Sequence, residues 1–269
     1  MLLSRAQLLA RPTRLAHSAI SSSVLIRSMA TTSPAVPSYL LHAPFLSIQR
    51  PHDPNYTPQL LQRTIPPSPL YYVHPPPATP PRSAPPALKL LDTPPVQGRS
   101  STVYRATSPS GAPVVLRYST DFLSLMREAD EVYVNLPAGT GLPIPTFWGI
   151  FEGRVEEEQA KAVVMVLEDC GQPLEGGFEA LTKEERETLY NFLDAFHSIH
   201  FQHGAFSPSS LVTRDNLSSS GDSTPTLSRK ITLTGFSKAE WHLCPGSDSC
   251  KELVEARKAL KLVDEEVVP

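Results

Sequence analysis

The stretch HGAFSPSSLV, from His203 to Val212, decides how the fold of this 269-residue chain is predicted. It directly follows residues 181–200, LTKEERETLYNFLDAFHSIH, in which apolar residues recur at helical spacing behind a capping box of Thr182 and Glu185. A glycine, a proline and three serines then interrupt the helical pattern. The sequence therefore predicts a loop here, and what the loop does depends on the elements around it.

Upstream, the chain has the pattern of a small sheet that carries one helix. Alternating apolar residues predict strands from Thr102 to Ala106 and from Pro113 to Tyr118, joined by a polar turn. Residues 121–136, DFLSLMREADEVYVNL, repeat apolar side chains at helical spacing. Glu128 falls on the apolar stripe of this predicted helix, and a buried carboxylate requires a cationic partner.

Further strands are predicted on both sides of the long helix. Residues 145–153, PTFWGIFEG, and 160–171, AKAVVMVLEDCG, form a strand pair, and the second is apolar enough to lie at the centre of a sheet. Residues 213–229 form a polar insertion that is expected to be flexible. A short strand, ITLTGF, and an amphipathic helix near residues 249–262 complete the pattern.

This order of elements resembles that of a protein kinase, and short motifs carry the resemblance to particular residues. VQGRSSTV is similar to the glycine-rich loop GxGxxGxV, of which Gly98 and Val103 remain. VVLR resembles the VAIK motif, puts Arg117 at the lysine position and implies Glu128 as its partner. MVLEDCG resembles the hinge beneath the adenine, with Leu167 as the gatekeeper.

The loop itself matches a kinase as well. HGAFSPSSLV aligns without gaps on the catalytic loop HRDLKPENIL, and more closely on the HGDLxPxN form of fungal and aminoglycoside-type kinases. TGFS, residues 234–237, aligns with the DFG segment. The resemblance implies an α+β, protein-kinase-like two-lobed fold for a domain of residues 87–265. Since 32 residues follow Ser237 and none of them forms an APE motif, the C-terminal lobe is expected to be shortened.

The departures from the family pattern concern the residues that act. A kinase uses a lysine on the phosphates, an aspartate on the substrate hydroxyl, and an asparagine and a second aspartate on magnesium. At these positions stand Arg117, Ala205, Ser210 and Gly235. A methyl group accepts no proton and a glycine binds no metal ion, so no catalytic residue is assigned.

The resulting hypothesis is a non-catalytic kinase-like module, a pseudokinase, that serves as a binding module or scaffold for protein partners. The alternative is an atypical ATP-dependent phosphotransferase that has a divergent active site and acts on a protein or a small molecule. No cofactor is expected, and binding of ATP with magnesium at the remnant of a nucleotide site is expected to be weak or absent. The residues of that remnant are Gly98, Val103, Arg117, Glu128 and Leu167.

The spacing of the histidines and cysteines does not predict a metal site. His242, Cys244 and Cys250 are three ligands, whereas a structural zinc site uses four, so no metal is predicted and the cysteines are expected to pack in the core. The histidines that recur at spacings of three, His197, His200 and His203, are interpreted as structural.

The N-terminal part differs in composition from the rest. Residues 1–52 contain no Asp or Glu, and residues 1–35 are either a mitochondrial transit peptide or a disordered tail, unless Met29 is the true start. Localisation is therefore either mitochondrial or cytoplasmic. Residues 36–86 are interpreted as a proline-rich disordered region. The twelve prolines of residues 66–95 form either a ligand for SH3 or WW domains or a stiff spacer.

Overall composition excludes several function classes. The net charge of −3 and the isoelectric point near 6.2 argue against nucleic acid as a partner. No apolar run reaches the roughly 18 residues that a membrane-spanning helix requires. Three cysteines without a framework spacing indicate a reducing compartment.

Overall fold

The structure is a computed structural model, and it describes residues 43, 45–49, 59–65, 85–98, 101–119, 121–134, 136, 142–155, 160–218 and 226–262. The predicted transit or tail segment and the proline run of residues 66–84 lie outside these residues. The strands are β1 (Phe45–Gln49), β2 (Gln59–Ile65), β3 (Ala87–Leu90), β4 (Val96–Gln97), β5 (Thr102–Thr107), β6 (Pro113–Ser119), β7 (Phe147–Val155), β8 (Ala160–Glu168), β9 (Gln172–Pro173), β10 (Phe201–Gln202), β11 (Leu211–Ser218), β12 (Thr226–Leu233) and β13 (Glu240–Trp241). The helices are α2 (Phe122–Glu128), α3 (Lys183–Ser198) and α4 (Lys251–Ala259), the π-helix η3 (Ala129–Val134), and the short 3-10 helices η4 (Gly177–Ala180), η5 (Pro208–Ser210) and η6 (Phe236–Lys238).

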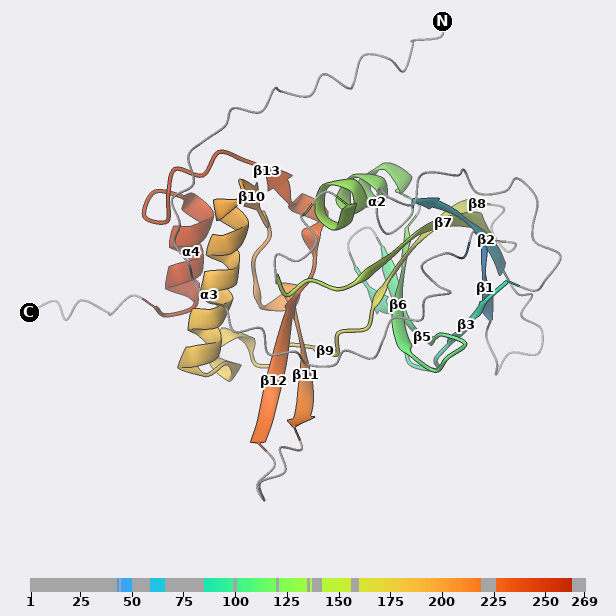
Figure 1. Cartoon of the computed structure of the whole chain (residues 1–269), viewed down its shortest axis with the longest axis horizontal. Coiled ribbons are helices and arrows are strands. Elements are labelled where there is room, and N and C mark those ends of the chain that lie inside the picture. Colours follow the sequence, from blue (N-terminus) through green and yellow to red (C-terminus); the bar gives the residue numbers. More distant parts are fainter. Residues whose placement is uncertain are drawn as a thin grey trace, which may run out of the picture. The chain divides into compact units, whose positions relative to one another are not determined.

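The first half of the described chain forms a sheet that closes on itself (Figure 1). The strand order is β3-β1-β2-β7-β8-β6-β5-β4, and β3 also pairs with β5, which joins the two ends. Neighbouring strands are antiparallel except for β1 and β3, which are parallel. The side chains inside this barrel form one buried apolar core that includes Leu46, Ile48, Leu61, Leu88, Ala106, Leu116, Phe151 and Val166.

Strands β1 and β2 are an addition to the predicted fold. They lie within residues 36–86, for which the sequence predicts disorder, yet Leu46, Ile48 and Leu61 are buried. The two strands are short and stand among prolines, so their local pattern is weak. Their stability comes from pairing with each other, with β3 and with the distant strand β7, none of which a local pattern reveals.

Strand β8 lies between β6 and β7, as its apolar sequence predicts. Val164 and Val166 face the barrel core, while Val163 and Met165 pack on the other side with residues of α2 and η3. Burial on both faces explains why no polar residue alternates in this strand. The helix predicted for residues 121–136 is also present, as α2 continued by η3.

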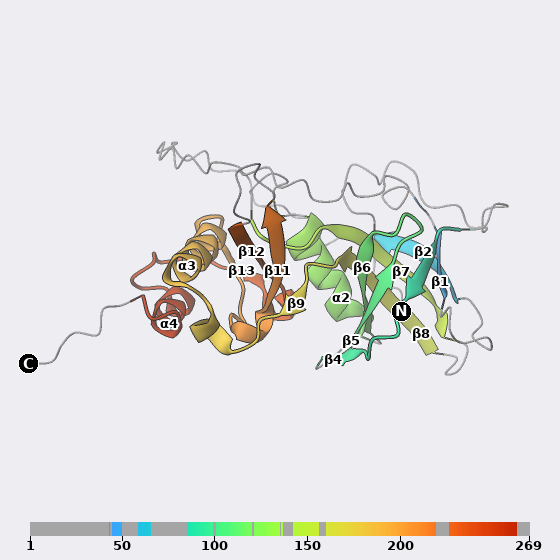
Figure 2. The ribbon, with the colours of Figure 1, turned by 90° about the horizontal axis from the view of Figure 1, so that it is seen from below.

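The second half of the described chain is built around α3. The predicted capping box is confirmed: Thr182 Oγ1 accepts from the Glu185 amide, and the Glu185 carboxylate accepts from the Thr182 amide. Its buried face packs on Phe201, Leu211 and Phe236 in a second core. Figure 2 shows α4 beside α3, in agreement with the contacts between the two helices. The mixture of helices and sheet predicted from the sequence is therefore confirmed.

Where the structure describes residues 213–229, which the sequence predicts to be a flexible polar insertion, they form strands. Strands β11 and β12 form an antiparallel hairpin in which Leu211 faces Leu233 and Ser218 faces Thr226, and β9 pairs with β11. The hydrogen bonds between these strands come from the backbone and do not require apolar side chains. The polar composition of the segment therefore did not indicate strands. Residues 219–225 lie outside the described part. Among the described helices, none has the length and apolar character needed to cross a membrane.

Candidate functional site

The outer face of the adjacent strands β5, β6 and β8 carries three of the residues that the sequence singles out, Val103, Arg117 and Leu167. Val103 is opposite Arg117 in the register, and Arg105 is opposite Val115, which is opposite Leu167 on β8. Since side chains two apart on a strand share a face, Val103, Arg105, Arg117 and Leu167 all lie on the side away from the barrel core. The sequence did not single out Arg105, although its position two residues after Val103 put it on the same face.

Arg117 forms an ion pair with Glu128, the last residue of α2. Arg117 Nη1 lies 2.6 Å from Glu128 Oε1, and Arg117 Nε donates to Ser101 Oγ at 2.9 Å. The side chains are 14% and 2% exposed, so both charges are largely removed from water. The partner implied for Arg117 is present. Glu128 Oε2 is buried and has no hydrogen-bond partner in the part of the chain that the structure describes.

The segment that resembles a glycine-rich loop contains a tight turn. The Gly98 amide donates to the Ser101 carbonyl at 2.8 Å, directly after β4 and before β5. A Cβ atom at position 98 would lie 2.9 Å from that carbonyl oxygen, which explains the need for glycine. The Gly98 amide is thus satisfied within the turn and is not free to bind a phosphate oxygen.

The side chain of Arg105, on β5, contacts the segment that resembles the hinge. It donates through Nη2 to the Gly171 carbonyl, and its Nη1 lies 3.6 Å from Asp169 Oδ2. Gly171 has φ of 113°, and an added Cβ would lie 2.1 Å from the Thr213 carbonyl oxygen, so only glycine fits. A side chain from the sheet therefore already binds the backbone that follows β8.

The loop from His203 is held by specific hydrogen bonds. His203 Nε2 donates to the Thr234 carbonyl at 2.8 Å, and its Nδ1 accepts from the Ala205 amide at 3.3 Å, which fixes the neutral Nε2–H tautomer. Burial lowers the pKa of His203, against the Thr234 carbonyl and the Glu252 charge, which raise it. Glu252 of α4 accepts from the amides of His203 and Gly204, at 3.0 and 2.7 Å.

Ser210 and Gly235 lie next to each other, as the resemblance implies for the two magnesium-binding positions. A Cβ atom on Gly235 would be 3.6 Å from Ser210 Cβ, and Thr234 donates from its amide to the Ser210 carbonyl at 2.7 Å. Ser210 Oγ is turned inward and donates to the Ser207 carbonyl at 2.7 Å. In the described parts of residues 203–237, the only carboxylate is that of Asp215, which lies on β11.

A column of aromatic rings connects this loop to the sheet. Ring centroids are 4.9 Å apart for His203 and Phe236, 6.1 Å for Phe236 and Tyr133, and 5.2 Å for Tyr133 and Phe147. Burial, together with the Glu128 charge, raises the pKa of the Tyr133 phenol. The loop, η6, η3 and β7 are therefore packed as one unit, which fixes the position of Glu128 relative to the loop.

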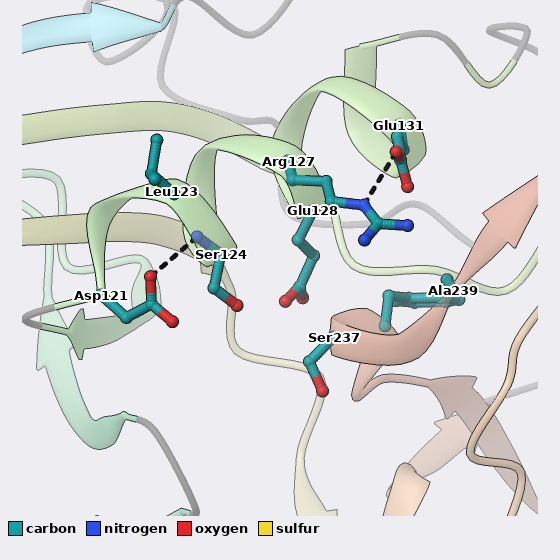
Figure 3. Close-up of a pocket in the computed structure, with 9 residues that line it drawn as sticks. Asp121, Leu123, Ser124, Arg127, Glu128, Glu131, Ser237 and Ala239 are labelled. Carbon is teal, nitrogen blue, oxygen red and sulfur yellow. Dashed lines mark hydrogen bonds and ion pairs between the residues drawn. The ribbon is translucent and has the colours of Figure 1, made fainter.

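A hollow of about 280 Å³ lies where α2 faces η6 (Figure 3). Its lining includes Asp121, Glu128, Glu131, Arg127 and Ser237. Arg127 Nε donates to Glu131 Oε1 at 3.0 Å, and Asp121 Oδ1 accepts from the Ser124 amide as the N-cap of α2. The lining has more carboxylates than cations, which disfavours an anionic ligand such as a triphosphate.

No family model matches the chain, and no curated protein matches it. Among solved structures the chain is similar to "Structure of vaccinia related kinase 3", with 18% sequence identity and a TM-score of 0.39. The match covers 59% of this chain and 49% of that chain, so it spans about half the length of the solved protein.

Proposed function

We propose that this chain is a kinase-like module, with a two-lobed fold and a shortened C-terminal lobe, that binds partners and does not transfer phosphate. The order of elements supports the kinase-like part: a small sheet, a helix that supplies Glu128, a long helix, the His203 loop and then Phe236. The contacts within these segments support it further, because Arg117 meets Glu128 and Ser210 meets Gly235.

One observation carries the non-catalytic part: both arginines on the outer face are already bound within the chain. Arg117 is paired with Glu128, and Arg105 is bound to the Gly171 carbonyl and lies near Asp169. A nucleotide at this face would have to displace Arg105, while nothing at Ser210 or Gly235 would hold magnesium. Phosphoryl transfer depends on metal and positioned charge, so the site is inactive in our proposal.

The proposal also includes the partners and the localisation of the module. A binding role fits a chain whose residues 66–95 are rich in proline, since a pre-extended segment docks on SH3 or WW domains at little entropic cost. The choice between mitochondrial and cytoplasmic localisation stays a prediction, and fusing residues 1–40 to a fluorescent reporter tests it.

The proposal is tested with purified full-length protein, ATP and magnesium. We expect no thermal shift with the nucleotide and no transfer of labelled phosphate to the chain itself or to a general acceptor protein. Phosphate transfer above that of a heat-denatured sample would establish the alternative, an atypical phosphotransferase.

Two variants test whether Arg105 blocks nucleotide binding, as distinct from the lack of magnesium ligands that prevents phosphate transfer. Arg105→Ala frees the Gly171 carbonyl, so we expect measurable nucleotide binding without transfer. Arg127→Ala, which removes an arginine of the exposed side of α2, is the matched control and should leave nucleotide binding unchanged. Tight ATP binding by the unmodified chain would contradict the role given to Arg105.

A further inference from the structure

Four side chains with metal-binding atoms meet beside α3 and α4, a region that Figure 1 shows next to β13. His197 lies in the last turn of α3, His242 and Cys244 follow β13, and Cys250 is the N-cap of α4. One ligand atom of each lies within 4.8 Å of all the others. From the sequence, three candidate ligands were identified here, His242, Cys244 and Cys250. The fourth, His197, precedes His242 by 45 residues, and only the folded structure brings it to this group.

The separations of these atoms approach those of ligands around a tetrahedral zinc ion. Zinc bonds of about 2.0–2.1 Å to nitrogen and about 2.3 Å to sulfur put neighbouring ligand atoms roughly 3.3 to 3.8 Å apart. His197 Nδ1 lies 3.4 Å from Cys250 Sγ and 2.8 Å from His242 Nε2. The distance from His197 Nδ1 to Cys250 Sγ already fits a tetrahedral site. The two imidazole nitrogens need to separate by about half an ångström, and a small movement of His242, a half-buried loop residue, can provide this.

Glu252 orients His197 for ligation. Its Oε2 lies 2.7 Å from His197 Nε2, and a carboxylate can only accept, so the imidazole proton is on Nε2. The lone pair of His197 Nδ1 then points at His242 and Cys250. Metal-bound histidines characteristically donate their other ring proton to a carboxylate in this way. The hydrogen bond between the two imidazole nitrogens carries one proton, and a metal ion would take its place.

The loop between the two cysteines is shaped to bring them together. Gly246 has φ of 103°, in the left-handed region, and its carbonyl accepts from the amides of Ser249 and Cys250, at 3.1 and 2.8 Å. Cys250 is then the N-cap residue of α4, so this turn sets where its side chain starts.

Ordinary core packing accounts for only part of this arrangement. Cys250 packs with Leu193, Leu253 and Ala256, as a buried thiol does. Two imidazoles whose ring nitrogens turn toward each other and toward that thiol are not apolar packing, since each nitrogen needs a polar partner. Cys170, also buried, belongs to no such group among the described residues and serves as the contrast.

We propose that His197, His242, Cys244 and Cys250 bind one Zn²⁺ ion as a structural site. Two thiolates balance the charge of the ion, and each thiol releases its proton to solvent on binding. A tetrahedral set of two sulfurs and two nitrogens is typical of zinc. The inference is independent of the proposed function, because it concerns none of the residues of the outer face.

The ion would fix the His203 loop indirectly. Glu252 binds His197 and also accepts from the amides of His203 and Gly204. A metal that holds His197 and Cys250 therefore holds the end of α3, the start of α4 and this loop in one arrangement.

Metal analysis of the reduced, full-length protein is the first test. We expect about one zinc per chain, and loss of the ion to a chelator should lower the melting temperature by on the order of 10 °C. Reconstitution with Co²⁺ should give the visible absorption of a tetrahedral site and the near-ultraviolet bands of thiolate-to-cobalt charge transfer.

The variant Cys244→His identifies the ligands in a protein that still offers four of them. We expect it to bind Co²⁺ with about half the charge-transfer intensity, because one thiolate remains of two. Cys250→Ser should lose the stoichiometric metal. His200→Asn, a neighbouring exposed histidine with φ of 61° that asparagine tolerates, is the matched control and should bind zinc normally.

Two results would overturn the proposal. One is a folded, reduced chain that retains less than a tenth of an equivalent of zinc after exposure to excess and gives no thiolate bands with cobalt. The other is a Cys244→His variant whose cobalt spectrum equals that of the unmodified chain, which would place the thiolates elsewhere.

Discussion

Replacing Arg117 with methionine leaves the Glu128 carboxylate buried without its cation. Methionine keeps most of the length of the side chain, so the loss is chiefly electrostatic. The Glu128 side chain is 2% exposed, and among the described residues Oε2 has no hydrogen-bond partner. The change therefore removes the cation of the pair, together with the hydrogen bond from Arg117 Nε to Ser101 Oγ.

The magnitude follows from two limits. Breaking a buried ion pair by removing one partner costs about 3–5 kcal/mol of unfolding free energy. The unpaired carboxylate can instead take up a proton, which for a glutamate in water costs about 3.7 kcal/mol at pH 7 and about 1 kcal/mol at pH 5. We expect Arg117→Met to destabilise the protein by about 3–4 kcal/mol at pH 7 and by roughly 1 kcal/mol at pH 5.

Urea unfolding at both pH values measures this difference. Arg127→Met is the control, because its pair with Glu131 is exposed and should contribute less than about 0.5 kcal/mol. The double variant Arg117→Met with Glu128→Leu should recover most of the loss, since no buried charge then remains. A loss below about 1 kcal/mol at pH 7, or one that does not change with pH, would refute the reasoning.

Three further predictions concern the loop and its supports. Thr182→Ala should cost about 1 kcal/mol in urea unfolding through loss of the α3 cap, and no measurable change would contradict the capping box. Burial lowers the pKa of His203, so the unfolded chain binds more protons than the folded chain as pH falls below about 6.5. The free energy of unfolding should therefore decline by up to about 1.4 kcal/mol per pH unit in that range. His203→Gln should flatten that slope, measured as melting temperature against pH. Gly171→Ala should lower the free energy of unfolding by about 3 kcal/mol or more, because the added Cβ would meet the Thr213 carbonyl. Gly111→Ala, also at positive φ but with open space around it, should lower it by about 1–2 kcal/mol. Equal losses in urea unfolding would contradict the steric argument.

Local patterns in the sequence predict the elements whose stability is local. The α3 cap lies within four residues of chain, and the apolar run of β8 identifies a central strand without knowledge of its neighbours. The Arg117–Glu128 pair was predictable because Glu128 falls on an apolar helical stripe and needs a cation, and the resemblance of VVLR to the VAIK motif implies Arg117, on the preceding strand, as its partner.

The remaining features depend on contacts between distant segments. β2 is held by β7, which follows it by more than 80 residues, so neither strand's pattern indicates the other. The hairpin of β11 and β12 is stabilised by its backbone, which polar side chains do not reveal. His197 joins the two cysteines only after α3 and α4 have packed, and therefore no sequence spacing contains that ligand set.

The closure of the sheet through β3 and β5 limits how other chains can attach to it. An open sheet offers unpaired amides and carbonyls along its edge, and many partners bind by adding a strand there. In the described residues, every strand of the sheet except the two-residue strand β4 has a paired neighbour on each side. Because β1 and β2 complete the ring, this barrel offers few free strand edges to which another chain could add a strand.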